Sequence, residues 1–269
     1  MTQLPTCDTL ALEQEGGVLH ITLNRPESRN AMSLAMVEEL RGLFSDIQDD
    51  PDTRAVVLRG AEGHFCAGGD VKDMAAARGQ KAEEGEDPFF KLNRAFGYLL
   101  TEVENAPQTT VAVLEGAVMG GGFGLACVSD IALAQSNAKF GLPETSLGIT
   151  PAQIAPFVVR RIGLTQARRL ALTGHRFDGR EALSVGLVHA CSEDRDQLEK
   201  QLAETIDRIR HCAPGASRLT KKLLLSVEKE PLEQLLDAAA RDFAQAIRGE
   251  EGQEGTMAFV QKRKPRWVE

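Results

Sequence analysis

The spacing of apolar residues in the first half of the chain predicts a mixed α/β fold. Residues 9–14 and 18–23 have the pattern of two short strands, and the Gly-Gly pair between them is typical of a tight hairpin. The continuous apolar runs 55–58 and 110–114 predict strands that are buried on both faces. Because each of these runs leads into a glycine-rich stretch and then a helix, the chain repeats a strand, a turn and a helix.

Helical spacing dominates elsewhere, above all after Pro151. Ser33 suits the N-cap of a helix whose apolar stripe runs to Ile47. We therefore expect a core in residues 1–200 and a helical C-terminal region in residues 201–269. The helices expected after Pro151 are residues 154–172, 180–185, 198–210, 213–227, 232–248 and 251–260.

The overall composition narrows the class of function. The chain has 269 residues, 42% of them hydrophobic, a formal net charge of -8 and a pI of about 5.3. An acidic balance argues against nucleic acid as the main ligand, because phosphate binding needs clustered Lys and Arg. The five cysteines are scattered without metal-ligand spacing, so we expect no metal site. Because no signal peptide or membrane span is apparent, we expect a cytoplasmic protein.

Two glycine-rich stretches, residues 64–74 and 120–124, are candidates for a site made of backbone N–H groups. Glycine allows these donors to approach a ligand, and a helix N-terminus adds partial positive charge. Either stretch alone also fits an ordinary strand-to-helix turn. Between them, residues 75–87 lack periodicity and predict a surface loop or irregular helix that could act as a lid.

Glu144 is the candidate acid/base because it follows Pro143 in a turn near both glycine stretches in the expected fold. A lone glutamate in a loop is usually solvated, so the role of Glu144 depends on the neighbouring motifs and on the family that they resemble. The chain contains no dinucleotide, P-loop, zinc-protease or serine-hydrolase motif. Cys66 and His64 could form a nucleophile and base, but we favour a packed structural thiol.

In these stretches the chain resembles the crotonase (enoyl-CoA hydratase/isomerase) superfamily, from about Val18 to Trp267. The resemblance implies a crotonase-like ββα spiral core with a helical C-terminal region that mediates trimerisation. It implies an acyl-CoA substrate, with coenzyme A as part of the substrate and no other cofactor, and a homotrimer or a dimer of trimers. The matching stretches are Asn24–Pro26 with Asn30-Ala31, Phe65–Lys72, Gly120–Ala126 with Asp130, and Phe140–Glu144 with Leu147–Ile149.

The resemblance also implies roles for individual residues. The backbone N–H groups of Gly69 and Gly121 would form an oxyanion hole around a thioester carbonyl, and Glu144 would transfer a proton. Phe259 and Lys262 would reach a coenzyme A bound to the adjacent subunit. Other residues expected to line the turn or contact the substrate and its coenzyme A are Arg25, Ala31, Ala67, Gly68, Asp70, Val71, Lys72 and Gly124.

One position departs from the usual pattern of the family. Ordinary enoyl-CoA hydratases carry two glutamates, and Gly124 stands where the first would be. This departure also occurs in the bacterial hydratases of 3-methylglutaconyl-CoA and isohexenylglutaconyl-CoA, which the block 150–163 resembles. The resemblance therefore implies hydration of a 3-branched glutaconyl-CoA in leucine or acyclic terpene breakdown. Gly124 would make room for a bulky acyl chain.

Two alternatives remain open at this point. An enoyl-CoA delta isomerase would use the same single glutamate to move a proton between two carbons. A non-catalytic acyl-CoA-binding or RNA-associated scaffold is a rival of another class. The acidic composition argues against RNA, and the retained Glu144 argues against a catalytically silent protein.

Overall fold

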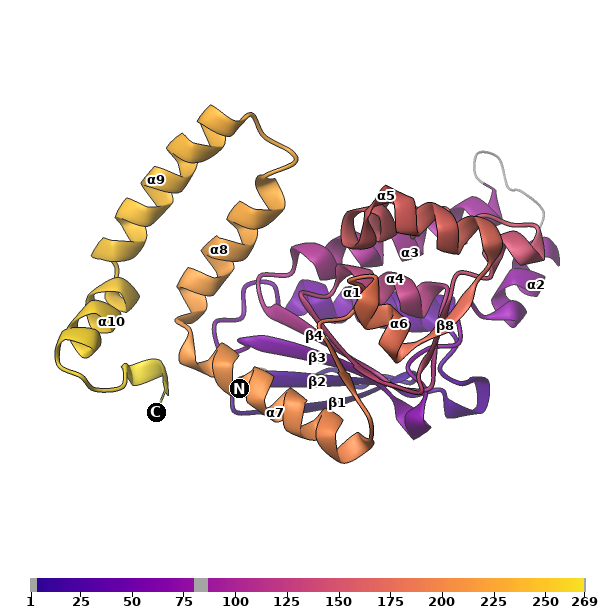
Figure 1. The fold of residues 1–269 in the computed structure, drawn as a ribbon, viewed down its shortest axis with the longest axis horizontal. Helices are drawn as coiled ribbons and strands as arrows, with labels where there is room; N and C mark the ends of the chain where they lie inside the picture. Colours follow the sequence, from indigo (N-terminus) through magenta and orange to yellow (C-terminus); the bar gives the residue numbers. More distant parts are fainter. Residues whose placement is uncertain (1–3, 80–86, 269) are drawn as a thin grey trace.

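The strands of this computed structural model, which describes residues 4–79 and 87–268, form two sheets (Figure 1). The six-stranded sheet has the order β1-β2-β3-β4-β6-β9, antiparallel between β1 and β2 and parallel elsewhere. In the three-stranded sheet, β5-β7-β8, β5 is parallel to β7 and β7 is antiparallel to β8. The strands are β1 Leu10–Glu15, β2 Val18–Leu23, β3 Ala55–Gly60, β4 Thr109–Leu114, β5 Ala117–Met119, β6 Ile131–Gln135, β7 Lys139–Gly141, β8 Arg176–Asp178 and β9 Ala190–Ser192.

The helices confirm most of the predicted periodic segments. The Ser33 hydroxyl accepts a hydrogen bond from the Met36 N–H and caps α1, as its position predicted. The α-helices are α1 Leu34–Asp46, α2 Val71–Gly79, α3 Pro88–Asn105, α4 Gly121–Val128, α5 Ala155–Thr173, α6 Gly179–Ser184, α7 Arg195–His211, α8 Pro214–Ser226, α9 Leu232–Arg248 and α10 Glu250–Val260.

The predicted hairpin between β1 and β2 is confirmed. Gly16 and Gly17 both have positive φ, 54° and 76°, and Glu15 pairs with Val18. A two-residue turn of this kind needs positive φ at both central positions, which glycine adopts without strain. The mixed α/β fold class expected from the apolar pattern is likewise confirmed.

Both faces of the large sheet are buried, as the continuous apolar runs indicated. In β3, Val56 and Leu58 face one core cluster together with α1, α3 and α4, while Ala55 and Val57 face a second cluster. Helix α7 closes this second face with Leu198, Leu202 and Ile206. Alternate residues of one strand therefore serve two cores.

Three short strands, β5, β8 and β9, were not predicted from the sequence. Each has three residues, and so short a run does not show the alternation that identifies a strand. The expected boundary near residue 200 falls inside α7, and the division into a core and a C-terminal region stays a prediction. Of the predicted lid, residues 75–79 belong to α2, whereas residues 80–86 lie outside the described residues.

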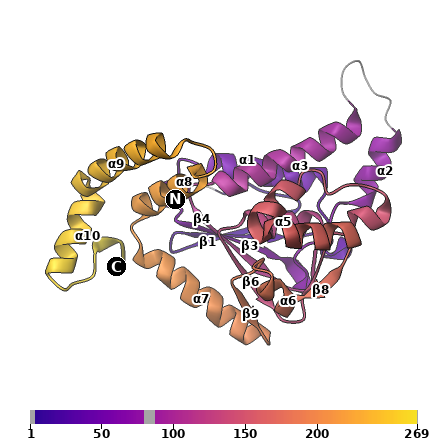
Figure 2. The same ribbon diagram turned by 45° about the horizontal axis from the view of Figure 1, so that its top comes forward.

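Helices α8, α9 and α10 form an arm that extends from the sheet-containing body, on the side opposite α2 (Figures 1 and 2). Throughout the described ranges, no helix is long and apolar enough to cross a membrane. Several large apolar side chains of the arm are exposed: Leu224, Val227, Leu232, Leu236, Phe243, Ile247, Met257, Phe259 and Val260.

Candidate active site

Three neighbouring parallel segments bring the predicted catalytic residues to one edge of the small sheet. Cys66 forms a parallel bridge with Val118 of β5, and Val118 pairs with Phe140 of β7. Parallel segments end at the same edge, so the residues that follow them converge. Gly69 follows the first segment, Gly121 follows β5 and Glu144 follows β7.

Neighbouring hydrogen bonds fix the direction of the Gly69 N–H. The carbonyl of Gly68 accepts from the Met32 N–H at 2.7 Å, and the N–H of Asp70 donates to the Met32 carbonyl at 3.0 Å. Because successive peptide groups of an extended segment point in opposite directions, the N–H of Gly69 points away from Met32. Within residues 4–79 and 87–268 it has no acceptor, so it is available to a ligand.

The N–H of Gly121 belongs to the first turn of α4. The preceding residue, Gly120, has a φ of 47° and donates its N–H to the Gly141 carbonyl at 3.1 Å, which ties this turn to β7. As a first-turn donor, the N–H of Gly121 has no partner within the helix, and no other described residue accepts from it. Helix α4 is buried over its whole length, so its positive end acts in a poorly solvated place.

Glu144 lies directly beside the second glycine turn. A Cβ on Gly120 would lie only 2.9 Å from Oε1 of Glu144, so glycine is needed for the carboxylate to come this close. The other carboxylate oxygen, Oε2, is buried and accepts no hydrogen bond from a described residue. Burial raises the pKa of the Glu144 carboxyl, and a hydrogen bond from its own backbone N–H offsets part of this rise.

Gly69, Gly121 and Glu144 line one cavity of about 470 Å³. This arrangement can polarise a carbonyl oxygen with two amide donors while one carboxylate moves a proton at a neighbouring carbon. No metal-ligating cluster occurs in the part of the chain that the structure describes. Other residues around this cavity include Met32, Asp70, Met74, Phe89, Phe90, Asn93, Phe96, Ile149, Gln153 and Ile154.

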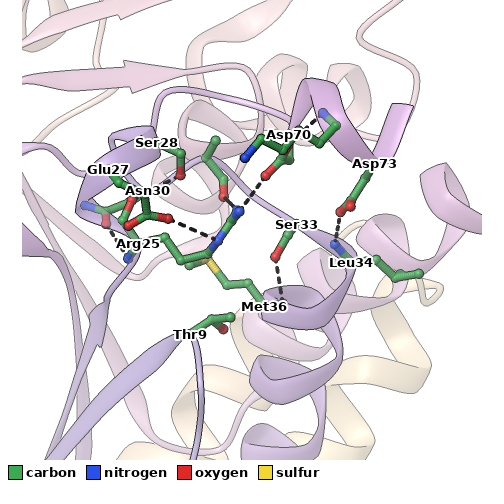
Figure 3. A network of polar contacts seen from close by, with 12 residues as sticks. Thr9, Arg25, Glu27, Ser28, Asn30, Ser33, Leu34, Met36, Asp70 and Asp73 are labelled. Atoms are coloured by element: carbon green, nitrogen blue, oxygen red, sulfur yellow. Dashed lines mark hydrogen bonds and ion pairs between the residues drawn. The ribbon is translucent and has the colours of Figure 1, made fainter. Parts of the chain in front are cut away.

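A largely buried polar network joins Arg25, Asn30 and Asp70, the residue that follows Gly69 (Figure 3). The Arg25 guanidinium donates to the Ala31 carbonyl at 2.7 Å and pairs with the Asp70 carboxylate at 2.7 Å. Burial opposes ionisation of Asp70, but the Lys72 N–H and the Arg25 guanidinium together hold the pKa of this carboxyl below its usual range. Arg25 therefore connects the segment around Ala31 to the turn that carries Gly69.

Asn30 completes this network. Its backbone has a φ of 56°, and its fully buried side chain accepts from the Arg25 N–H and donates to the carbonyls of Ala61 and His64. Asparagine tolerates this left-handed conformation better than most residues and supplies both a donor and an acceptor. The motif from Asn24 to Ala31 thus has a clear structural role.

The other predicted contact residues lie at different depths. Around the first glycine turn, Ala67 and Lys72 are exposed, Val71 is 76% exposed, and Gly68 is buried. Ala31 is buried under the same turn. Their contacts with coenzyme A remain predictions.

Phe259 and Lys262 lie on the C-terminal arm, not around the cavity of the same chain. Phe259 is 85% exposed at the end of α10, and Lys262 follows with a φ of 54°. A larger groove of about 720 Å³ separates α8, α9 and α10, and none of the described residues that line it is a predicted site residue. The expected contact of Phe259 and Lys262 with a coenzyme A bound to the adjacent subunit stays a prediction.

The space next to Gly124 differs from the expectation. Gly124 does not line the described cavity, and a Cβ there would lie 3.3 Å from Ile154 Cγ1 and 3.4 Å from Leu100 Cδ1. Ile154 lines the cavity itself. Instead of opening room for an acyl chain, the missing side chain at position 124 leaves volume that Ile154 and Leu100 occupy.

Several cavity residues were missed by the sequence analysis, among them Phe96, Asn93 and Gln153. One signal was present for two of them, because Gly97 interrupts a helical pattern next to Phe96 and close to Asn93; Gln153 had none. The reading of Cys66 as a packed thiol agrees with the structure. Cys66 is fully buried, and burial raises its pKa to about 11, so it is a poor nucleophile.

Comparison with known proteins identifies the family. The sequence profile described as Enoyl-CoA hydratase/isomerase matches residues 13–269. The chain is 35% identical over 256 residues to a putative enoyl-CoA hydratase of Thermus thermophilus, covering 94% of this chain and 98% of that relative.

Two solved structures have the same fold. AtuE of Pseudomonas aeruginosa is 65% identical with a TM-score of 0.94, covering 97% of this chain and all of that one. An enoyl-CoA hydratase/isomerase from Marinobacter aquaeolei is 61% identical with a TM-score of 0.96, covering 98% of this chain and all of that one. The expected crotonase-like fold and enzyme class are therefore confirmed, and the chain belongs to the enoyl-CoA hydratase/isomerase family.

Proposed function

We propose that this enzyme adds water to a 3-branched glutaconyl-CoA, either isohexenylglutaconyl-CoA or 3-methylglutaconyl-CoA, in acyclic terpene or leucine catabolism. The observation that carries the proposal is the Glu144 carboxylate, whose buried Oε2 has no hydrogen-bond partner among the described residues, in one cavity with the N–H groups of Gly69 and Gly121, which have no described acceptor. The other two carboxylates that the described residues contribute to this cavity are already engaged, Asp70 with Arg25 and Asp73 with the Leu34 N–H. No second carboxylate can come from position 124, where Ile154 and Leu100 pack.

In the proposed reaction, Glu144 serves first as base and then as acid. Its carboxylate takes a proton from water while the water oxygen bonds to C3 of the substrate. The electron pair of the double bond moves toward the thioester, and the N–H groups of Gly69 and Gly121 stabilise the resulting enolate oxygen. Protonated Glu144 then returns its proton to C2, so a single carboxyl group completes the addition.

The cavity supports a bulky acyl group. Met74, Phe89, Phe90 and Ile149 line it and are between 36% and 59% exposed. Apolar side chains that remain accessible around a cavity can lose that exposure by covering an apolar ligand. This supports the isohexenyl substrate over a short acyl chain.

The proposed assembly is a homotrimer or a dimer of trimers in the cytoplasm. The exposed apolar residues of the arm, with Phe259 and Lys262 near its end, support association through α9 and α10. In this assembly the arm of one chain would contribute to the coenzyme A site of the next.

The test is incubation with isohexenylglutaconyl-CoA, 3-methylglutaconyl-CoA and crotonyl-CoA in ¹⁸O-labelled water, followed by mass analysis. We expect labelled oxygen in the product, with faster turnover of a glutaconyl ester. Equal turnover of crotonyl-CoA would contradict the substrate class.

A delta isomerase is the second candidate, because a single carboxyl group is sufficient to move a proton between two carbons. Glu144 beside the N–H groups of Gly69 and Gly121 could also perform this reaction, whereas the accessible apolar lining supports the bulky glutaconyl ester of the first proposal. The same experiment separates the two reactions: an unlabelled product with a shifted double bond would identify an isomerase.

A further inference from the structure

A glycine in the middle of α3 creates a notch that holds a glutamine side chain. Gly97 is buried, and a Cβ at this position would lie 1.9 Å from Oε1 of Gln153 and 2.6 Å from Nη1 of Arg94. Glycine in a helix interior is destabilising relative to alanine, so its presence needs a reason. Here the reason is the placement of the Gln153 amide against the helix.

Hydrogen bonds fix the orientation of this amide. Arg94 donates to Oε1 of Gln153 at 3.2 Å, and Nε2 of Gln153 donates to Oδ1 of Asn93 at 3.1 Å. The guanidinium of Arg94 stacks 3.8 Å above the centre of the Tyr98 ring. This stacking restrains Arg94, the first donor in this series of hydrogen bonds. Because Arg94 can only donate, Oε1 of Gln153 must face it, and the amide orientations of Gln153 and Asn93 follow.

Among the described residues, most of the unused hydrogen-bonding capacity of this amide pair is therefore on donors. Nδ2 of Asn93 retains two N–H groups and Nε2 of Gln153 retains one, whereas Oε1 and Oδ1 each already accept one bond and keep one lone pair. Asn93 and Gln153 both line the cavity that contains Glu144, Gly69 and Gly121. The charge of Arg94 behind them further favours an acceptor that carries negative charge.

We propose that Asn93 and Gln153 bind the second carboxylate of the substrate, and that Gly97 and Arg94 position them for it. This inference rests on the proposed function, because a simple enoyl-CoA has no such carboxylate. It adds a recognition site for the end of the substrate remote from the thioester. The pair thereby determines specificity without taking part in the proton transfer.

The decisive variant is Gly97→Ala. Its new methyl group displaces the ends of two flexible side chains, Gln153 and Arg94, while alanine favours the helix, so the protein should remain folded. Gly42→Ala is the matched control, since Gly42 is exposed in α1 with nothing within 4 Å of its added Cβ. Asn93→Leu and Gln153→Met test the donors directly.

The readout is the ratio of kcat/KM for 3-methylglutaconyl-CoA to that for 3-methylcrotonyl-CoA, which differ by one carboxylate. We expect Asn93→Leu, Gln153→Met and Gly97→Ala to lower this ratio about tenfold or more, mainly through KM. The control Gly42→Ala should leave it unchanged. An equal loss with both substrates would overturn carboxylate binding, because a general structural defect does not distinguish them.

The failure of this inference can be told apart from failure of the proposed function. If the unaltered enzyme shows no preference for 3-methylglutaconyl-CoA or isohexenylglutaconyl-CoA over their decarboxylated analogues, the proposed substrate class is wrong. If it shows this preference and all three variants retain it, the substrate class stands and the assignment of Asn93 and Gln153 is wrong.

Discussion

Ile154 occupies the space that a side chain on Gly124 would enter, with its Cγ1 only 3.3 Å from the position of an added Cβ. One residue comes from α4 and the other immediately precedes α5. A side chain at position 124 and Ile154 in its present position would therefore compete for the same space. A second catalytic group could not be restored at position 124 without altering its neighbour.

Gly124→Glu is therefore expected to destabilise the protein, because overpacking alone costs about 1–3 kcal/mol and a buried charge adds to it. Removing the obstructing side chain in Gly124→Glu/Ile154→Ala should recover part of this loss. Chemical denaturation of the two single variants and the double variant measures their coupling. Strictly additive effects would show that Ile154 does not limit the space at position 124.

Glu144→Gln should lower kcat by about 10²- to 10⁴-fold, the usual contribution of a positioned acid/base. The amide has nearly the same shape, so the affinity for an acyl-CoA should stay within a few fold. Single-turnover kinetics together with calorimetric titration of a product analogue measures both effects. Substantial residual turnover would show that another group transfers the proton.

The raised pKa of Glu144 predicts a pH dependence of activity. The carboxylate must be ionised to accept a proton from water, so kcat/KM should fall on acidification at a pH above the normal range of glutamate. This acidic limb should disappear from the residual activity of Glu144→Gln. An acidic limb at an ordinary glutamate pKa would contradict desolvation of the free enzyme.

The same shift predicts the effect of Glu144 on stability. A carboxyl whose pKa is higher in the folded than in the unfolded protein favours folding only while protonated, so its contribution is lost as pH rises through the folded pKa. Glu144→Gln should therefore be more stable than the unaltered protein at neutral pH, and this gain should shrink below the unfolded pKa. Thermal unfolding at several pH values gives the comparison.

Asp70→Asn tests the support of the oxyanion hole. It leaves the Arg25 charge in a buried place without its partner, which typically costs about 3–5 kcal/mol, and it loosens the turn that carries Gly69. The more exposed pair Arg41–Glu102, whose side chains are 36% and 34% exposed, provides the control, since Glu102→Gln should cost less than breaking the pair of Arg25 and Asp70. Because the pKa of Asp70 is lowered, its contribution is present above the unfolded pKa and is lost as pH falls through the folded pKa.

Urea denaturation at neutral and acidic pH measures this contribution. We also expect kcat of Asp70→Asn to fall more than the substrate affinity, since the oxyanion hole acts mainly on the transition state. Equal stability losses for Asp70→Asn and Glu102→Gln would show that the pair of Arg25 and Asp70 stabilises the protein no more than the more exposed pair of Arg41 and Glu102.

The sequence allowed local features to be predicted better than contacts across the chain. The Gly16-Gly17 hairpin and the Ser33 cap depend on residues next to one another, and both were confirmed. The packing of Ile154 against Gly124 joins residues that no periodicity relates. β5, β8 and β9 were missed for another reason: strands of three residues have too few positions to show alternation.

In the candidate site, too, local motifs could be predicted from the sequence, whereas contacts between distant residues could not. Motifs in the sequence identified Glu144 and both glycine turns, whereas Asn93 and Gln153, which line the same cavity, belong to no motif. Gly97 alone indicated the region close to Asn93, since an isolated glycine in a helix has a packing or functional reason. The hydrogen bonds that orient Gln153 depend on rotamers, which the order of residues does not specify.

The exposed apolar surface of α9 and α10 has a consequence for measurement. Phe243 and Phe259 are 70% and 85% exposed on an arm that reaches away from the body of its own chain. Exposing such an apolar surface to water is unfavourable. Any association between chains that covers it stabilises the folded state, and this stabilisation increases with protein concentration. We therefore expect the melting temperature to rise with protein concentration. A melting temperature of this protein must therefore be given together with the protein concentration at which it was measured.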